Sequence, residues 1–530
     1  MSISSNAPRV KPHFAFLSHI RPLALACLFL VALSTLSAWP LPVRTLQAGE
    51  PPNDPVSARV DLRLEGNRIS LRAHEASLRE VLEAFASYGV RVSMQPGVEA
   101  TIHGEVRDVP VEEALRELLG NLNYDILWRE IPFGRSRVLA LSGIRVYRDG
   151  AANDPMQSVA PGERRIRTLE TGERYLADEV LMGMGPGVSP DDFRALLRSM
   201  GGQVVAVDPD LGIYRIRLPA NSNVPALLAR LKGEAGVAVV EPNFVYELPG
   251  SSPMPLQHRA DAPALRDLPP PVAGAPALAI LDSGLEAEWL GDGALRASMD
   301  ATNPQREISD PVGHGTQMAL IGSGRIAPHG AGHPGDAASA PIVAIRGFDE
   351  EGLSTSFGIL ESLRFSREQG AGVVSMSWGS YTRSEILNAG FQQAADADMI
   401  LLAAAGNDGK TDPMYPAAYP AVLAVGALDA HGGIWEKSNR GEHVDFVSYG
   451  SADFPVGSRG PPGPYAGTSI ATPWVAAAIT TYRARYPQAT SEQIIRVLTQ
   501  SLSPHSAEIQ GAGSGRFDEN ARLRFLETAP

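Results

Sequence analysis

Three residues whose types are those of a catalytic set lie beside glycines, each at the end of a predicted element. Asp282 ends the run ALAILDSG, His314 lies in GHGT, and Ser469 lies in AGTSIATP. Each of them alone favours a structural interpretation, because aspartate commonly caps a turn, serine commonly caps a helix, and a lone histidine is commonly a surface residue. Their shared glycine context and their order along the chain favour a joint role, since such sets keep one order within a fold.

The segments around these residues predict a parallel sheet. Apolar runs such as LAILDSG, PIVAIRGF, VVSMSWG, MILLAAAGN and AVLAVGAL alternate with helical patterns. Continuous apolar runs are typical of parallel strands that are buried on both faces and joined by crossover helices. We predict such helices over residues 356–369 and 384–396, and an apolar helix over residues 471–482 that Pro473 begins. Sites in sheets of this kind form at the carboxyl ends of the strands.

Five segments of this region resemble the signature segments of the subtilisin-like serine peptidases. The segments are AILDSG, GHGT, SMSWG, AAAGN and GTSIATP, and the resemblance extends over residues 276–526. It implies an α/β fold, a subtilisin-like parallel sheet with helices on both faces, over residues 276–527. It also implies that Ser469 attacks the peptide carbonyl, that His314 transfers the proton, and that Asp282 orients the imidazole.

The same resemblance assigns residues to the oxyanion and to the substrate. Asn407, taken alone, would be a turn residue before Asp-Gly. The resemblance implies that its side-chain amide, together with the Ser469 backbone N–H, donates to the oxyanion. The segment Ser377, Trp378 and Gly379 is expected to pair with extended substrate and to wall its first pocket. The segment that begins at Gly347 is expected to form the opposite rim. Whether the pocket prefers small, apolar or basic side chains stays open.

Two residues depart from the family pattern, and one loop carries candidate metal ligands. Gln317 stands where the family commonly has histidine, and Trp474 stands where it has another histidine, so the rate is in more doubt than the mechanism. The loop around residues 322–340 offers one carboxylate, Asp336, and two histidines, His329 and His333, which make a weak metal site. We therefore expect no cofactor and no metal, and calcium is possible but not supported.

The region before the predicted peptidase contains a small α+β unit over residues 165–248. Ser189 followed by a proline and two aspartates predicts a helix start, and Gly201 predicts its end. The order strand, helix, two strands, helix, strand, closing in VVEPNFVYEL, resembles the propeptide of the subtilisin family. The resemblance implies an inhibitor-like domain that occupies the cleft until it is removed; the alternative is a generic α+β module. Residues 249–275 are rich in proline and predict an exposed linker, and processing is expected there or just before it.

A second small α+β unit is predicted over residues 57–147. Two near-copies of one helical pattern, LREVLEAF and VEEALREL, place apolar residues at i, i+3, i+4 and i+7. The second copy has Val111, Ala114, Leu115 and Leu118 on its buried face. With the phrase DVPVEEALRELLGNLNYDILW, this duplicated unit resembles the short N-terminal domain of secretins and TonB-dependent receptors. The resemblance implies a protein partner in the cell envelope; an unrelated α+β domain is the alternative.

The N-terminus and the composition bound the remaining properties. The basic stretch and the apolar run PLALACLFLVALSTL predict an export signal within residues 1–48, cleaved after Ala38 or Ala48, or else an uncleaved membrane anchor. The chain has one cysteine, Cys27, inside this segment, which excludes a disulfide in the mature protein. The net charge of -13 argues against binding to nucleic acid.

These observations predict an exported serine endopeptidase, made as a self-processing precursor, that acts on protein or peptide substrates. The alternative is an envelope interaction or scaffold protein whose peptidase domain is inactive or cleaves only itself. The export signal and the secretin-like unit favour the periplasm or the cell envelope, and free secretion is the alternative.

Overall fold

The computed structural model describes residues 59–530 with the exception of short gaps. The residues that lie outside the description are 66, 89, 121, 134–135, 149–155, 160–165, 220–221, 249–251, 254–264, 304–305, 333–339 and 506–510. The predicted export signal with Cys27, most of the predicted linker, His333 and Asp336 therefore lie outside the described residues. Among the residues that are described, no helix combines the length and the apolar character that a membrane span needs.

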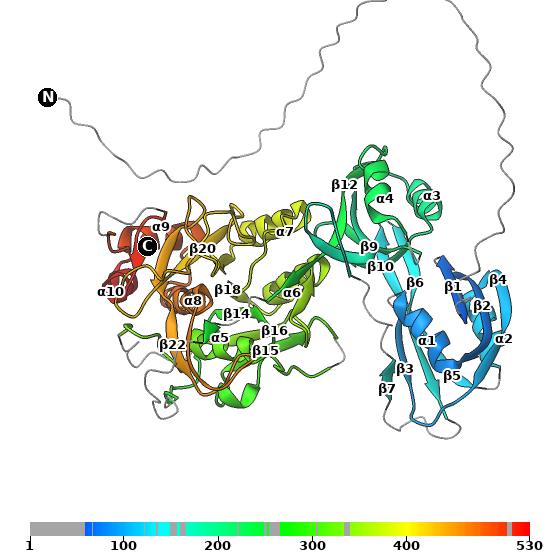
Figure 1. The fold of residues 1–530 in the computed structure, drawn as a ribbon, viewed down its shortest axis with the longest axis horizontal. Coiled ribbons are helices and arrows are strands. Elements are labelled where there is room, and N and C mark those ends of the chain that lie inside the picture. Colours follow the sequence, from blue (N-terminus) through cyan, green and yellow to red (C-terminus); the bar gives the residue numbers. More distant parts are fainter. Residues whose placement is uncertain are drawn as a thin grey trace, which may run out of the picture. The chain divides into compact units, whose positions relative to one another are not determined.

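A parallel sheet of eight strands forms the centre of the C-terminal region, as predicted (Figure 1). The six strands between the edge strands are largely apolar and nearly all their residues are buried, so the sheet needs helices on both faces to exclude water. In spatial order the strands are β15 (Leu295–Asp300), β16 (Ile342–Arg346), β14 (Ala277–Asp282), β18 (Ala371–Met376), β19 (Ile400–Ala404), β20 (Val422–Leu428), β21 (Phe446–Tyr449) and β24 (Arg516–Phe517).

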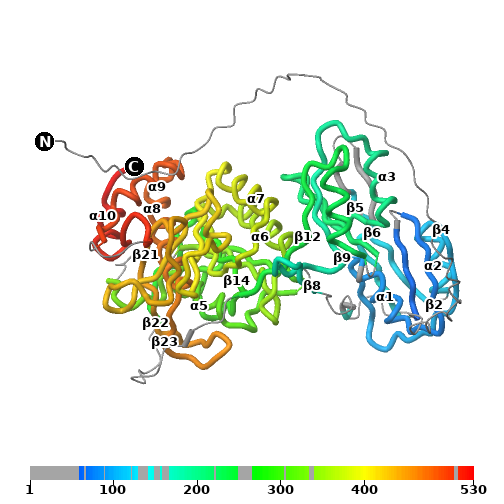
Figure 2. Tube along the Cα trace, turned by 45° about the horizontal axis from the view of Figure 1, so that its top comes forward, coloured from blue at the N-terminus to red at the C-terminus, as the bar shows by residue number. Residues whose placement is uncertain are grey.

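Successive residues of a strand supply two separate cores, one on each face of the sheet. In β14, Leu278 and Ile280 belong to one core, and Ala279 and Leu281 belong to the other. The first core is closed by α5 (His314–Gly322), α8 (Thr468–Arg485), α9 (Ser491–Ser501) and α10 (Glu519–Glu527). The second core is closed by α6 (Ser356–Glu368) and α7 (Glu385–Asp396). Figure 2 shows the C-terminal helices α8, α9 and α10 lying together.

The start of α8 differs from its prediction. The helix begins at Thr468, so Pro473 lies inside it and does not begin it. A proline has no N–H to donate, which leaves the carbonyl oxygen four residues earlier, that of Ser469, without its helical partner. The Ser377 hydroxyl donates to this oxygen at 2.9 Å. The proline thus makes the Ser469 carbonyl available to the neighbouring segment, which the helical pattern alone did not show.

Several short elements lie in the loops that connect the strands and helices of this region. They are η1 (Ala287–Trp289), β17 (Leu353–Thr355) and an antiparallel group of β13 (Ser252–Pro253), β23 (Gly463–Ala466) and β22 (Ser451–Phe454). The strand β23 leads directly into Gly467 and the start of α8.

An antiparallel sheet with two helices precedes the parallel sheet, in the element order that the sequence predicts. Its strands run in the order β10 (Gln203–Asp208), β11 (Ile213–Arg217), β9 (Arg174–Met184) and β12 (Val237–Glu247), and β8 (Ile166–Thr168) pairs with β9. The helices are α3 (Pro190–Met200) and α4 (Val224–Leu231). Ser189 caps α3 by accepting from the Asp192 N–H, and Gly201 ends it with a left-handed φ of 61°. The sheet continues through β12 into β17, a strand of the peptidase region.

The N-terminal region consists of two small sheets and two helices around a core of its own residues. One sheet has the order β1 (Val60–Glu65), β2 (Arg68–Ser77) and β4 (Thr101–Pro110). The other has the order β5 (Asn123–Phe133), β6 (Ser136–Tyr147), β3 (Arg91–Met94) and β7 (Gln157–Val159). The helices are α1 (Leu78–Ser87) and α2 (Val111–Leu119). On α2, Leu119 is fully buried and Leu118 only partly, because the last turn of the helix rotates the apolar face by one residue relative to the predicted spacing.

Candidate active site

Asp282 and His314 form a buried hydrogen-bonded pair at the carboxyl end of the sheet. Asp282 is the last residue of β14, and His314 is the first residue of α5. The His314 Nδ1 lies 2.7 Å from the Asp282 Oδ1, and the two residues are 5% and 1% exposed. A carboxylate at this nitrogen fixes the tautomer that leaves Nε2 free to accept a proton.

Burial and two carboxylates act in opposite directions on the His314 imidazole. Burial lowers its pKa, but the charge and hydrogen bond of Asp282 and the charge of Asp310 together outweigh burial, so the pKa is raised above its ordinary value of 6.5. Arg459 opposes this shift weakly. The site therefore favours the imidazolium, the state that a general base reaches when it has taken a proton.

The glycines on both sides of His314 are required by close backbone contacts. Gly313 has a left-handed φ of 84°, and a Cβ there would lie 2.0 Å from the Gly457 carbonyl oxygen. A Cβ on Gly315 would lie 2.3 Å from the Gly284 carbonyl oxygen. Contacts this short exclude any side chain at either position. The GHG sequence thus lets α5 begin directly against the loop that follows Asp282.

Asp310, which the sequence analysis did not single out, organises the first turn of α5. Its buried carboxylate accepts from the Gly313 N–H at 2.8 Å and from the Ser283 hydroxyl at 2.7 Å. It also accepts from both the N–H and the hydroxyl of Thr316, each at 2.7 Å. A carboxylate at a helix N-terminus satisfies N–H groups that have no helical partner. Its position three residues before the helical glycine was the available sequence signal.

Ser469 lies in the first turn of α8, next to the segment that follows β18. Its Oγ donates to the Ser377 carbonyl oxygen at 3.4 Å, and the Ser377 hydroxyl donates to the Ser469 carbonyl oxygen at 2.9 Å. Within the described part of the chain, no hydrogen bond joins the Ser469 Oγ to His314. Helices α5 and α8 pack against each other at the same edge of the sheet. Hydrogen bonds between a nucleophile and its base commonly tighten only when substrate binds, so their absence before binding does not exclude this pair.

Asn407 follows β19 and is held by the residue that precedes Ser469. Its Oδ1 accepts from the backbone N–H and from the hydroxyl of Thr468, each at 2.9 Å. These two bonds fix which end of the amide faces the helix, so the Nδ2 donor is directed away from Thr468. A Cβ on Gly467 would lie 3.3 Å from this Nδ2, so the glycine keeps the approach to it open. The geometry suits a donor to an oxyanion formed at Ser469.

The predicted substrate segments separate into residues with different surroundings. Ser377 contacts Ser469, as described above, and Gly379 lies beside Met414. Trp378 faces the other way: it is 1% exposed, and its ring packs on Phe348 at 5.4 Å between centroids. Gly347 donates its N–H to the Asp282 carbonyl oxygen at 2.8 Å and thus lies at the base of the site. The part of this rim that pairs with another chain segment is Gly352–Thr355, not Gly347.

The segment that leaves the N-terminal antiparallel sheet pairs with both sides of the site. Strand β12 pairs antiparallel with β17, and the Leu248 N–H then donates to the Gly352 carbonyl oxygen at 2.9 Å. Four residues further on, Ser252 pairs with Ala466 of β23, three residues before the nucleophile position. Both pairings join this segment to strands of the C-terminal region, and β23 leads into the helix that carries Ser469.

The same sheet places polar side chains on the N-termini of α6 and α7. The Glu241 carboxylate accepts from the Ser384 hydroxyl and, at 3.1 Å, from the Glu385 N–H at the start of α7. The Asn243 Oδ1 accepts from the Phe357 N–H at the start of α6 at 3.2 Å. These N–H groups have no partner within their helices, so the antiparallel sheet satisfies donors that the helices of the C-terminal region leave open.

Burial at this contact raises the pKa of Glu241 to about 7, against hydrogen bonds from Ser384 and from the α7 backbone that lower it. Glu179 behaves in the opposite way. Burial would raise its pKa, but Arg215 and Arg217 outweigh burial and lower it to about 2. Asn243 joins the two regions, since its Nδ2 donates to Glu179 at 2.7 Å.

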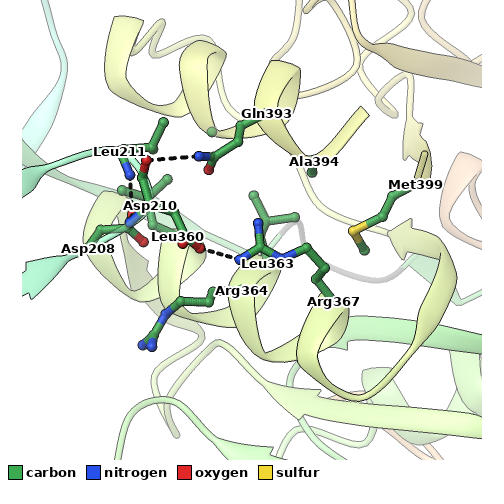
Figure 3. Close-up of a pocket in the computed structure, with 11 residues that line it drawn as sticks. Asp208, Asp210, Leu211, Leu360, Leu363, Arg364, Arg367, Gln393, Ala394 and Met399 are labelled. Carbon is green, nitrogen blue, oxygen red and sulfur yellow. Dashed lines mark hydrogen bonds and ion pairs between the residues drawn. The ribbon is translucent and has the colours of Figure 1, made fainter. Parts of the chain in front are cut away.

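A third contact between this sheet and the peptidase domain closes a small pocket beside α6 and α7 (Figure 3). Asp210 forms an ion pair with Arg367, and its carbonyl oxygen accepts from the Gln393 amide at 3.0 Å. Asp208 holds the turn by accepting from the N–H groups of Asp210 and Leu211. The turn thus anchors the far end of the inhibitor-like sheet to both helices.

Metal-ligand clusters are rare among the described residues. Only one group, His74, Glu75 and His103 on strands β2 and β4, brings three such side chains together, and all three are exposed. His329, one of the two histidines of the predicted weak site, bonds to Asp453 at 2.9 Å.

Comparison with known proteins identifies both regions. Residues 274–513 match the model of the subtilase family, and residues 161–243 match that of the fervidolysin N-terminal prodomain. The chain is 32% identical over 207 residues to thermitase of Thermoactinomyces vulgaris, which covers 38% of this chain and 71% of thermitase. It is 31% identical over 227 residues to the minor extracellular protease Epr of Bacillus subtilis (strain 168), which covers 42% of this chain and 34% of Epr. The chain thus spans about a third of the length of that relative.

Solved structures show the same fold. The crystal structure of fervidolysin from Fervidobacterium pennivorans, a keratinolytic enzyme, superimposes with a TM-score of 0.52 at 21% sequence identity. The superposition covers 67% of this chain and 62% of the fervidolysin chain. The fold and the site define a subtilisin-like serine protease with an N-terminal prodomain. The chain belongs to the subtilase family.

Proposed function

We propose that this protein is an exported serine endopeptidase that uses Asp282, His314 and Ser469 and matures by cleaving its own chain. The observation that carries the proposal is the buried 2.7 Å bond between His314 and Asp282 at the helix that packs against the Ser469 helix. An imidazole held in one tautomer beside a serine at a helix start has the geometry of a base and its nucleophile.

Each step of the reaction has a residue to perform it. The Ser469 Oγ attacks the peptide carbonyl carbon while the His314 Nε2 accepts the hydroxyl proton, and Asp282 stabilises the resulting imidazolium. The Asn407 amide and the Ser469 N–H donate to the oxyanion. His314 returns the proton to the leaving amine, which leaves an acyl ester on Ser469. Water then attacks the ester by the same route and releases the carboxylic acid.

The prodomain contacts support processing in the same molecule. Leu248 pairs with Gly352, and Ser252 pairs with Ala466, which lies three residues before Ser469 in the chain. We expect mass spectrometry of the mature enzyme to find a new N-terminus between Leu248 and Pro253. A first cleavage far down the linker would contradict processing at these contacts.

Reaction with a fluorophosphonate probe tests the proposal directly. The purified chain is expected to be labelled and its precursor to shorten, whereas Ser469→Ala is expected to do neither. If the wild-type chain stays unlabelled and full-length, the endopeptidase proposal fails. Self-cleavage without any turnover of added casein would instead favour a scaffold protein that only processes itself.

The region over residues 57–147 is proposed to bind a protein of the cell envelope, which favours the periplasm or envelope over free secretion. The support is its core, which is built from its own residues, together with its resemblance to the short secretin and TonB N-terminal domain. Fractionation of cells that express the full chain, compared with a chain that lacks this region, tests both the location and the partner.

A further inference from the structure

Two glycines face a common slot beside the proposed nucleophile. Gly379 follows Ser377, whose hydroxyl bonds to the Ser469 carbonyl, and Gly406 directly precedes Asn407. The two glycines belong to segments that continue the neighbouring strands β18 and β19 beyond the edge of the sheet. Because neither glycine has a side chain, both walls of the slot are backbone.

The Met414 side chain occupies this slot. A Cβ on Gly379 would lie 2.6 Å from the Met414 sulfur, and a Cβ on Gly406 would lie 2.7 Å from it. The sulfur is therefore wedged between the two walls, and Met414 is only 9% exposed. The residue next to it is fixed to one wall, since Ser380 and Tyr415 exchange two backbone hydrogen bonds of 2.7 Å.

The slot lies where the side chain before the scissile bond must go. The reacting carbonyl has to lie between the Ser469 hydroxyl and the Asn407 amide, and the side chain is attached one bond away from that carbonyl. Two backbone segments lie beside these groups, since Ser377 exchanges hydrogen bonds with Ser469 and the Gly406 N–H donates to the Thr468 hydroxyl at 3.2 Å. Hence the space between Gly379 and Gly406 receives the P1 side chain.

We propose that Met414 fills the P1 pocket and makes this peptidase selective for bonds that follow glycine, alanine or serine. The inference rests on the proposed endopeptidase function. A larger P1 side chain has to displace the thioether, and the flexibility of methionine lets this happen at a cost and not as a complete block. Differences of one or a few methylenes in such a pocket commonly change kcat/KM by about 10- to 200-fold.

Two other observations agree with a pocket for small side chains. Asp408, the acidic residue nearest to Asn407, accepts from the Tyr381 hydroxyl at 2.7 Å, and Lys410 lies over the Tyr381 ring at 5.0 Å. A basic P1 side chain would have to compete with both groups. The self-substrate also fits, because the sequence between Leu248 and Ser252 is Pro-Gly-Ser.

A series of tetrapeptide p-nitroanilides that differ only at P1 tests the proposal on the full-length, self-processed protein. We expect kcat/KM for alanine to exceed that for leucine and phenylalanine by at least about 10-fold. Met414→Ala and Met414→Gly are expected to reverse this order. A wild-type enzyme that prefers leucine or phenylalanine overturns the inference, and this measurement needs no variant to fold.

Met399→Ala is the matched control. Met399 is similarly buried in the same domain, but it precedes β19 and lies at the opposite end of the strand that leads to Asn407. It is expected to lower stability without changing the P1 order. An equal change in P1 order in both variants would also overturn the inference. Fluorophosphonate labelling of each variant separates the two hypotheses, since an unlabelled wild type contradicts the endopeptidase function itself.

Discussion

Asn407 is the residue whose orientation the surrounding chain controls most directly. Two bonds from Thr468 fix its amide oxygen, so its nitrogen is available to charge that develops only in the transition state. We expect Asn407→Ala to lower kcat by about 10²- to 10³-fold with little change in KM, a magnitude known for this kind of donor in a subtilisin. Steady-state kinetics on a small-P1 peptide measures it.

Thr468→Val provides the control for this change. It removes the hydroxyl bond to Asn407 but keeps the backbone N–H bond, so we expect a smaller loss than for Asn407→Ala. A fall of less than 10-fold in kcat for Asn407→Ala would show that the amide does not serve the oxyanion.

The pH dependence of the reaction is set by His314. As the pH falls, a histidine loses its neutral, basic form. Because the pKa of His314 is raised, this loss begins at a higher pH than in an ordinary histidine. The acidic limb of kcat/KM should therefore have its midpoint above pH 6.5. Asp310→Asn removes a charge that favours the imidazolium, so we expect the midpoint to move to lower pH. An unchanged midpoint in this variant would limit Asp310 to holding the helix start.

Glu241 makes the contact between the prodomain and α7 sensitive to pH. In the folded precursor its pKa is about 7, whereas the unfolded chain exposes a carboxyl with the ordinary value of 4.5. The folded state therefore binds more protons between these values, and its free energy of unfolding falls as pH rises from about 4.5 to 7. We expect denaturant unfolding of the Ser469→Ala precursor to show this decrease.

Glu241→Gln tests the assignment, because glutamine keeps one of the two acceptor oxygens that serve Ser384 and the Glu385 N–H but does not titrate. In the same Ser469→Ala background its stability should change less between pH 5 and pH 8 than that of the parent precursor. Identical pH profiles would contradict the role given to Glu241. Glu179, with its lowered pKa, stays ionised throughout this range and does not confuse the comparison.

The elements of the peptidase domain were largely predictable from sequence, and its precise contacts were not. Continuous apolar runs, which strands buried on both faces require, predicted β14, β18 and β19. The predicted helices 356–369 and 384–396 agree with α6 and α7 to within one residue at each end. The start of α8 was wrong because a proline can lie inside a helix when another group satisfies the carbonyl it leaves open. Met414 was missed because its role depends on segments distant in sequence, whereas Asp310, close to the start of α5, left a sequence signal that was not used.

Among the described residues, the core of the N-terminal region is built from residues between Val60 and Val146. Such a region should fold without the peptidase, and the peptidase without it. A chain that lacks residues 57–147 is expected to process itself and to hydrolyse small-P1 peptides within about 2-fold of the full chain. Loss of processing in this deletion would show that the region assists folding and is more than a binding module.

The packing of the prodomain on Trp378 has an optical consequence. The Tyr246 ring, near the end of the prodomain, packs at a tilted angle against this indole with 5.9 Å between ring centroids, and the indole is 1% exposed while the two are together. Departure of the prodomain should bring water to the ring and move its emission to longer wavelength. Activation could then be followed in real time by intrinsic fluorescence, with Trp378→Phe removing the signal from the background of the other tryptophans. Trp378 is thus an intrinsic fluorescent probe of prodomain release.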